Sequence, residues 1–283
     1  MSSSTFVIGG DLKVNRLGFG TMRLTGEGIW GEPANRKQAL AVLHRALELG
    51  INLLDTADSY GPEVAERLIA EALHPYPKGL VIATKAGFQR PGPNRWVEDG
   101  RPHHLREAVA GSLQRLRLER IDLLQLHRID PKVPLDDQIG TLVDLQKEGK
   151  IKHIGLSEVN VEQIEAVQRI TTIVSVQNRY NLVDRNSEPV LDYCTNEKLG
   201  FIPWFPLATG SLAKQGGPLA RAAERLHATP AQVAIAWLLK KSPVMLPIPG
   251  TSTVEHLEEN MKGESLELDD ATMDSLEGQV ITR

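Results

Sequence analysis

Short, almost continuously apolar segments alternate with longer segments of helical periodicity along the whole chain. Near-continuous apolar runs are typical of parallel strands that are covered by helices. The pattern predicts eight strands, at residues 16–22, 52–56, 80–85, 121–127, 151–156, 173–177, 201–205 and 244–248. Helices are predicted near residues 35–49, 62–73, 103–118, 135–148, 161–170, 188–199, 230–241 and 269–277.

Eight strand–helix units in 283 residues predict a (β/α)8 TIM barrel of the α/β class, as one domain over 1–283, because an open doubly wound sheet more often stops at about six strands. Residues 5–14, with a Gly-Gly turn, predict a β-hairpin that precedes the barrel and plugs its amino-terminal end. Pro62 is expected at a first helical position, and capping boxes are expected at Thr229 and Ser252. The box at Ser252 predicts a short extra helix after the eighth strand.

Composition excludes several classes of protein. Hydrophobic residues make up 41% of the chain, which is enough to build a core, so a disordered chain is excluded. Cys194 is the only cysteine, which rules out an internal disulfide and fits a reducing cytosol. The net charge of −4, the short apolar runs and the uncharged amino terminus argue against nucleic-acid binding, membrane association and secretion. We therefore expect a cytoplasmic protein, and a monomer because no segment suggests self-association.

Titratable side chains end three consecutive predicted strands. Asp55 ends the second strand, Lys85 the third and His127 the fourth, and Tyr60 follows Asp55 by five residues. A polar group at the end of an apolar strand is costly unless it is paired. In a barrel these ends meet at one face, where active sites lie. The sequence therefore predicts one cavity that contains all four side chains.

These residues resemble the aldo-keto reductase superfamily, and in particular its small bacterial members of the pyridoxal reductase-like type. The resemblance extends from Gly18 to Asn260. Its matching segments are Asp55-Thr56-Ala57 with Tyr60-Gly61, Thr84-Lys85, Leu126-His127, Gly155-Leu156-Ser157, Gln177 with Tyr180-Asn181, and Ile248-Pro249-Gly250 leading to Glu259-Asn260. Any one segment is weak evidence, whereas all of them in order at strand ends form a specific pattern.

Carbonyl reduction needs a hydride donor and a proton donor, and only a cofactor can supply the hydride. Tyr60 is a suitable proton donor if the Lys85 ammonium lowers its pKa from about 10. Asp55 would keep the buried Lys85 charged, and His127 would orient the carbonyl oxygen. The resemblance implies the same roles for these four residues, with NADPH as the cofactor and an aldehyde or ketone, such as a pyridoxal-like compound, as the substrate.

The resemblance also implies the cofactor site. Ser157 and Gln177 would hold the nicotinamide amide, and Trp204 would stack on the ring. Further contacts are expected from Gly20, Thr21, Met22, Asp55, Pro206, Leu207, Ile248 and Gly250, with phosphate contacts from Thr251, Ser252 and His256 and adenine contacts from Glu259 and Asn260. Glu158 replaces the family's usual Asn, and Gly250 and His256 replace a Lys and an Arg. NADPH is therefore expected to be favoured only modestly, with NADH binding more weakly.

Three long segments, 23–34, 86–102 and 207–218, are expected to be functional loops, the first bringing Trp30 to the substrate. Residues 26–31 fit G-x-G-x-x-G, but Pro33 separates them from the next helix, which argues against a dinucleotide-binding turn. Adjacent His103 and His104 do not have metal-ligand spacing, so no metal is expected.

Several alternatives stay open. Asp55 and Lys85 could form a purely structural ion pair, and Trp204 could belong to the barrel core. Ser252 could be a plain helix cap, and Glu259 and Asn260 a solvated helix end. At the level of function, the alternatives are a class I aldolase that uses Lys85 as a Schiff base, and a cofactor-sensing regulatory or binding subunit on the same fold.

Overall fold

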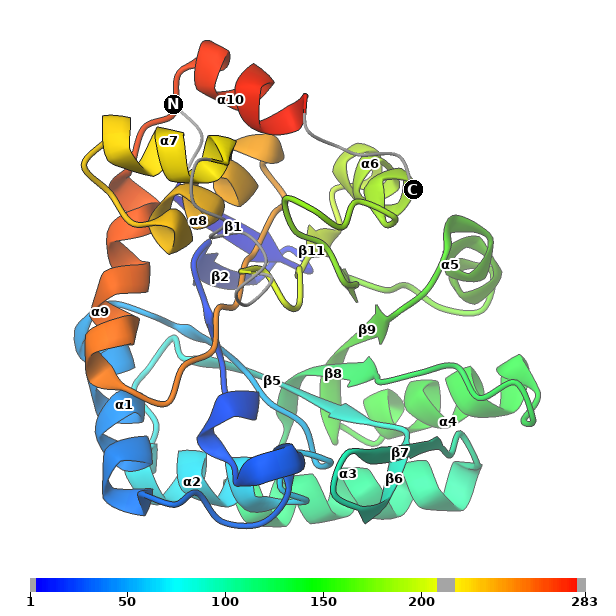
Figure 1. Ribbon diagram of the computed structural model, residues 1–283. Helices are drawn as coiled ribbons and strands as arrows, with labels where there is room; N and C mark the ends of the chain where they lie inside the picture. The colour runs from blue at the N-terminus through cyan, green and yellow to red at the C-terminus, as the bar shows by residue number, and fades with distance from the viewer. Residues whose placement is uncertain (1–3, 208–216, 279–283) are drawn as a thin grey trace.

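A curved sheet of seven parallel strands is the centre of the computed structural model, which describes residues 4–207 and 217–278 (Figure 1). The strands follow the order β11-β10-β9-β8-β5-β4-β3 across the sheet. Their bounds are β3 Phe19–Gly20, β4 Leu53–Asp55, β5 Val81–Ala86, β8 Ile121–Leu126, β9 Ile151–Ser157, β10 Ser175–Gln177 and β11 Gly200–Phe201. All six residues of β5 are buried, as expected for an apolar strand between a core and a helical layer.

Residues 244–248 close the sheet into a barrel. On one side, the Phe201 N–H donates to the Val244 carbonyl at 2.9 Å, and the Leu246 N–H donates to the Phe201 carbonyl at 2.8 Å. On the other side, the Gly18 N–H donates to the Pro247 carbonyl at 3.0 Å. The predicted eighth strand therefore lies between the two edge strands, although it is not a regular strand; Pro247 has no N–H to add to a ladder.

Ten α-helices surround the strands in the described part of the chain (Figure 1). Eight of them occupy the predicted positions, the predicted extra helix is present as α9, and α7 was not predicted. Their bounds are α1 Arg36–Glu48, α2 Val64–Leu73, α3 Pro102–Leu116, α4 Leu135–Lys147, α5 Val161–Gln168, α6 Glu188–Glu197, α7 Pro218–Arg225, α8 Pro230–Lys241, α9 Val254–Met261 and α10 Asp270–Glu277. None of these helices is long and apolar enough to cross a membrane.

The predicted amino-terminal hairpin is present as β1 Thr5–Ile8 and β2 Leu12–Asn15, with both turn glycines at positive φ. Ile8 and Val14 are fully buried. They belong to the same cluster of buried side chains as Leu53 and Val81, which begin β4 and β5. The hairpin therefore covers the end of the barrel at which the strands begin and leaves the opposite end open for a site.

Helix starts differ from the sequence prediction at two places. Pro62 is not helical, because Glu63 adopts a left-handed conformation (φ 66°) and α2 begins only at Val64. The capping box at Thr229 is confirmed by reciprocal bonds with Gln232. At α9 the cap is Thr253 rather than Ser252, since the Thr253 hydroxyl accepts from the His256 N–H at 3.3 Å.

Two of the three long segments contain regular structure. Segment 86–102 contains a hairpin, β6 Phe88–Gly92 and β7 Arg95–Glu98. Segment 23–34 begins within the short helix η1 Met22–Leu24 and contains η2 Glu27–Ile29, while a third short helix, η3 Lys262–Ser265, follows α9. Most of the third segment, 208–216, lies outside the described residues.

Candidate active site

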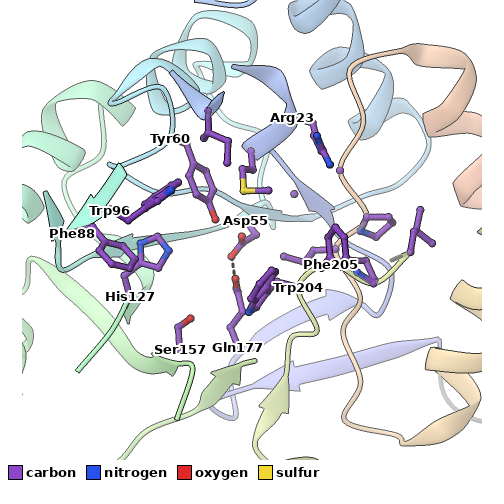
Figure 2. Close-up of a pocket in the computed structure, with 18 of the residues that line it drawn as sticks. Arg23, Asp55, Tyr60, Phe88, Trp96, His127, Ser157, Gln177, Trp204 and Phe205 are labelled. Atoms are coloured by element: carbon purple, nitrogen blue, oxygen red, sulfur yellow. Dashed lines mark hydrogen bonds between the residues drawn. The ribbon is translucent and has the colours of Figure 1, made fainter. Parts of the chain in front are cut away.

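A cavity of about 450 Å³ opens at the carboxyl ends of the strands (Figure 2). Its walls combine the ends of the central strands with the β6–β7 hairpin and the segments around residues 22, 205 and 249. The lining residues are Gly20, Met22, Arg23, Ile29, Asp55, Tyr60, Phe88, Trp96, His127, Arg128, Ser157, Gln177, Trp204, Phe205, Pro206, Leu207, Ile248, Pro249 and Gly250. Asp55, Tyr60 and His127 therefore share one cavity, as the sequence predicts, whereas Lys85, the fourth predicted residue, does not line it.

Lys85 and Asp55 form a buried ion pair beneath this cavity. The Lys85 Nζ donates to Asp55 Oδ1 at 2.6 Å and to the Thr56 carbonyl at 2.8 Å, and the lysine is fully buried. The other carboxylate oxygen of Asp55 accepts from the amides of Gln177 at 2.7 Å and Gln125 at 3.2 Å. Both charges are thus compensated by short, directional contacts, which a buried pair requires.

Lys85 also connects this pair to Tyr60, to whose hydroxyl oxygen its Nζ donates at 3.3 Å. An ammonium is only a donor, so the Tyr60 oxygen accepts and its own proton is free to point into the cavity. Burial disfavours the charged form of Lys85, but attraction from Asp55 and Tyr60 outweighs this effect and raises the pKa of Lys85. Lys85 is therefore a fixed cation next to the phenol.

The pKa of Tyr60 corrects one expectation from the sequence. Lys85 does act to lower it, but the loss of water around the buried phenol is the larger effect, so the pKa of Tyr60 is raised above its usual value. Tyr60 is consequently a neutral phenol at ordinary pH. A neutral phenol can donate a proton, which is the step that carbonyl reduction needs.

His127 faces Tyr60 across the cavity, with ring centroids 6.0 Å apart. Its Nδ1 lies 3.3 Å from the Ser59 hydroxyl oxygen. Burial lowers the pKa of His127 well below its usual range, and the cations Lys85, Arg128 and Arg90 lower it further. The imidazole is therefore neutral and carries one N–H.

Aromatic side chains of the β6–β7 hairpin complete this wall. The ring centroids of Phe88 and His127 are 4.6 Å apart, and those of Trp96 and Tyr60 are 6.4 Å apart. All four side chains face the same cavity (Figure 2). The Arg90 guanidinium stacks 3.6 Å from the Trp96 centroid. Sequence reasoning assigned this segment to a loop and missed these residues. The signal for the turn in the sequence was Pro93–Asn94, and in the structure Asn94 adopts a positive φ there.

Arg128 was also missed, although it directly follows His127. It lines the cavity, and its Nη1 donates to the His127 carbonyl at 2.6 Å and to Ser157 Oγ at 3.1 Å. A second arginine, Arg23, lines the cavity on the side away from His127 (Figure 2). The cavity therefore has cationic side chains at both sides.

The residues expected to contact the nicotinamide line the cavity, but with partners of their own. The Gln177 amide donates to Asp55, and Ser157 accepts from Arg128. Trp204 is half-buried and lines the cavity, rather than belonging to the barrel core. Glu158 accepts from the Trp204 Nε1 at 2.6 Å and so fixes the orientation of the indole.

Gly20 and Gly250 form a part of the cavity wall without side chains. A Cβ on Gly20 would lie 2.7 Å from the Ile248 carbonyl oxygen, and a Cβ on Gly250 would lie 2.5 Å from the Gly20 carbonyl oxygen. A lysine at 250 would therefore clash with the backbone here. The Cγ of Arg23 is 3.6 Å from the same Cβ position, so Arg23 brings a cation to this wall instead.

Seven predicted binding residues are outside the set that lines the cavity: Thr21, Trp30, Thr251, Ser252, His256, Glu259 and Asn260. Thr21 is buried and donates to the Asp55 carbonyl at 3.1 Å. Trp30 lies 5.6 Å from the Arg90 guanidinium, next to Ile29, which does line the cavity. Ser252 and His256 are exposed at the start of α9, just beyond Gly250.

Two alternative sites lack structural support. Residues 26–31 form a short helical turn beside Gly61 and not a strand-to-helix turn, so they are not a dinucleotide-binding motif. Among the described residues, no group of His, Cys, Asp or Glu side chains could hold a metal ion.

Comparison with known proteins gives a consistent result. The model of the Aldo/keto reductase family matches residues 16–280. Over 92% of its length the chain is 54% identical to an uncharacterized oxidoreductase of Schizosaccharomyces pombe, of which it covers 84%. It is 42% identical to the pyridoxine 4-dehydrogenase of Escherichia coli, with 98% of this chain and 99% of that protein covered.

Solved structures agree with the sequence relatives. The glycerol dehydrogenase of Gluconobacter oxydans superposes with a TM-score of 0.89 at 26% identity, covering 98% of this chain and 95% of that one. An aldo-keto reductase of Klebsiella pneumoniae in complex with NADPH has a TM-score of 0.84, also at 26% identity, over 98% and 95% of the two chains. These similarities confirm the predicted (β/α)8 class, and the chain belongs to the aldo/keto reductase family.

Proposed function

We propose that this protein is an NADPH-dependent reductase of aldehydes or ketones in which Tyr60 is the general acid. The observation that carries the proposal is the contact series from Asp55 through Lys85 to the Tyr60 hydroxyl, at 2.6 and 3.3 Å, beneath a cavity that also contains His127. This series holds a neutral phenol next to a permanent cation. The phenol can then give its proton to an oxygen that gains negative charge.

The cavity fits a nicotinamide dinucleotide. Gly20 and Gly250 contribute backbone to its wall, and Arg23 supplies a cation beside them that could bind a phosphate. When bound, NADPH would supply the hydride that no side chain can provide. The NADPH complex of the Klebsiella pneumoniae relative supports this cofactor, and we expect NADH to bind more weakly because Arg23 would favour the additional phosphate.

The residues of the chain divide the remaining tasks. Tyr60 donates the proton to the carbonyl oxygen, and Lys85 stabilises the phenolate that results. If the Ser59 hydroxyl donates to Nδ1 of His127, the ring proton lies on Nε2 and can bind the same carbonyl oxygen. Asp55 acts on Tyr60 only indirectly, because it keeps Lys85 in place.

An aromatic aldehyde such as pyridoxal is the substrate type that we propose. Phe88 and Trp96 form apolar walls next to Tyr60 and His127, which suits a planar ring. The 42% identity with a pyridoxine 4-dehydrogenase supports the same class.

The test is NADPH oxidation with a panel of aldehydes and ketones that includes pyridoxal, for the wild type and Tyr60→Phe. The variant should lose at least about 100-fold in kcat, because it lacks the proton donor. It should keep its NADPH affinity, because phenylalanine fills nearly the same volume as tyrosine. Near-native turnover by Tyr60→Phe would contradict the assignment. A protein that binds NADPH but reduces no member of the panel would instead be a cofactor-sensing subunit.

The same panel tests the aldolase alternative. Lys85 is a fully buried cation with three acceptors, and a Schiff base needs a neutral, accessible amine. Borohydride treatment in the presence of carbonyl substrates should therefore leave Lys85 unmodified. Covalent trapping of a substrate on Lys85, detected by mass spectrometry, would favour the aldolase.

A further inference from the structure

Arg128 is a cation in the cavity wall whose hydrogen-bonding capacity is only partly used. Its Nη1 donates to the His127 carbonyl and to Ser157, both neutral acceptors. Within residues 4–207 and 217–278, no carboxylate lies within 4.0 Å of it, and its Nε and Nη2 have no hydrogen bond. A guanidinium has five N–H groups in a plane, so one edge of Arg128 is available to a ligand in the cavity.

Arg90, the neighbouring arginine on β6, shows the contrast. Its Nε donates to the Arg95 carbonyl at 3.0 Å, its Nη1 to the Ser59 carbonyl, and its Nη2 to the Gly28 and Ile29 carbonyls. All three nitrogens are thus committed to the backbone, and Arg90 holds the hairpin against the segment around residue 29. Arg128 has no comparable structural task for its second edge.

The anions whose charge acts on Arg128 are Glu158 and Glu98, and neither lies within ion-pair distance of its guanidinium. Asp55 is already paired with Lys85 at 2.6 Å. Glu158 is held through one carboxylate oxygen by the Trp204 indole and the Arg179 N–H, both at 2.6 Å. Burial lowers the pKa of His127, and the cations Lys85, Arg128 and Arg90 lower it further, so the neighbouring imidazole is neutral and does not compete for an anion.

The position of Arg128 relates this cation to the reacting groups. Its guanidinium carbon is 5.4 Å from the centroid of the Phe88 ring, and the His127 ring is 4.6 Å from the same centroid. A planar ring that lies against Phe88 and Trp96, with its carbonyl at Tyr60 and His127, would therefore place a ring substituent near Arg128. Carboxylate and phenolate oxygens are the groups that a free guanidinium edge binds best.

We propose that Arg128 determines substrate specificity by binding an anionic oxygen on the ring of an aromatic aldehyde. This inference rests on the proposed reductase function and adds the chemical class that the cavity favours: planar aldehydes that carry a carboxylate or a phenolate. Pyridoxal, with an acidic phenol next to its aldehyde, is one member of the class. Neutral aromatic aldehydes would be reduced by the same groups, but with a weaker apparent affinity.

The experiment compares benzaldehydes that carry a carboxylate ortho, meta or para to the aldehyde with the corresponding methyl esters. At the best position the wild type should prefer the acid by about 10- to 100-fold in kcat/KM, the size expected for a hydrogen bond to a charged group. Arg128→Leu should abolish the preference, so that the ratio of kcat/KM for the acid to kcat/KM for the ester falls to about one. Arg128→Lys, which retains the charge but not the planar edge, should keep part of the preference.

Arg95→Leu is the matched control, because it removes the same charge at an exposed position that does not line the cavity. It should keep the wild-type ratio of acid to ester. A wild type without any preference for the acids would overturn the inference. So would an Arg128→Leu variant that loses acid and ester reduction equally, since that result would mean that Arg128 only positions Ser157.

Binding of the same acids and esters, followed by tryptophan fluorescence, separates this inference from the proposed function. If the protein reduces no aldehyde but still binds the acid more tightly than the ester through Arg128, the reductase proposal fails and the anion site remains. If both compounds bind equally to the wild type and to Arg128→Leu, the anion site fails whatever the activity. A thermal unfolding scan of each variant confirms that it is folded.

Discussion

Replacement of Lys85 by methionine tests the centre of the proposed site. Methionine has nearly the same length and is apolar, so the change removes the charge while it preserves most of the packing. Asp55 Oδ1 loses its lysine partner, whereas Oδ2 keeps the amides of Gln177 and Gln125. Tyr60 loses the cation that opposes the effect of burial on its pKa.

The magnitude follows from the burial of the pair. Removing one member of a buried ion pair typically costs about 3–5 kcal/mol, because the remaining charge is left uncompensated. Two amide donors still bind Asp55, so we expect a loss near the lower limit, about 3 kcal/mol in the free energy of unfolding. The double variant Asp55→Asn/Lys85→Met should recover most of this loss, since neither charge remains.

Chemical denaturation followed by tryptophan fluorescence measures these stabilities in the wild type, both single variants and the double variant. The activity readout is the pH profile of alcohol oxidation, which needs deprotonated Tyr60. Without Lys85 the pKa of Tyr60 rises further, so the rate should increase only at a higher pH than in the wild type. Two results together would refute the reasoning. The stability losses of Asp55→Asn and Lys85→Met would add in the double variant, and the pH profile of Lys85→Met would match that of the wild type.

Two further predictions follow from other parts of the structure. Burial, reinforced by the charge of Glu66, raises the pKa of Asp58 to about 8. The folded state therefore binds more protons than the unfolded state between about pH 4 and pH 8. The wild type should consequently lose stability as the pH rises through this range. Asp58→Asn should remove this loss. Chemical denaturation of the wild type and the variant at about pH 5 and pH 8 measures it; if stability changes equally with pH in both proteins, the Asp58 carboxyl is ionised throughout and the prediction is wrong. Arg23→Gln should weaken NADPH binding by about tenfold and NADH binding less, because the variant lacks the cation beside Gly250. Equal effects on both cofactors in a fluorescence titration would place Arg23 away from the additional phosphate.

The sequence by itself determined the order of the strand–helix units and the identity of the strand-end residues. Apolar runs and helix caps are local features, and they were sufficient for β5, for the Thr229 capping box and for the position of Lys85. Parallel strands bring their carboxyl ends to one face, so Asp55, Tyr60 and His127 could be placed in one cavity without coordinates.

The tertiary structure decided what surrounds these residues, because contacts between distant segments are not encoded in local patterns. The β6–β7 hairpin brings Phe88 and Trp96 to His127, and the approach of Gly20 to residue 250 excludes a lysine there. The direction of the pKa shift of Tyr60 also depended on the structure. The sequence supplied the neighbouring cation, but desolvation sums over every group that displaces water from the phenol, and here it exceeds the attraction of Lys85.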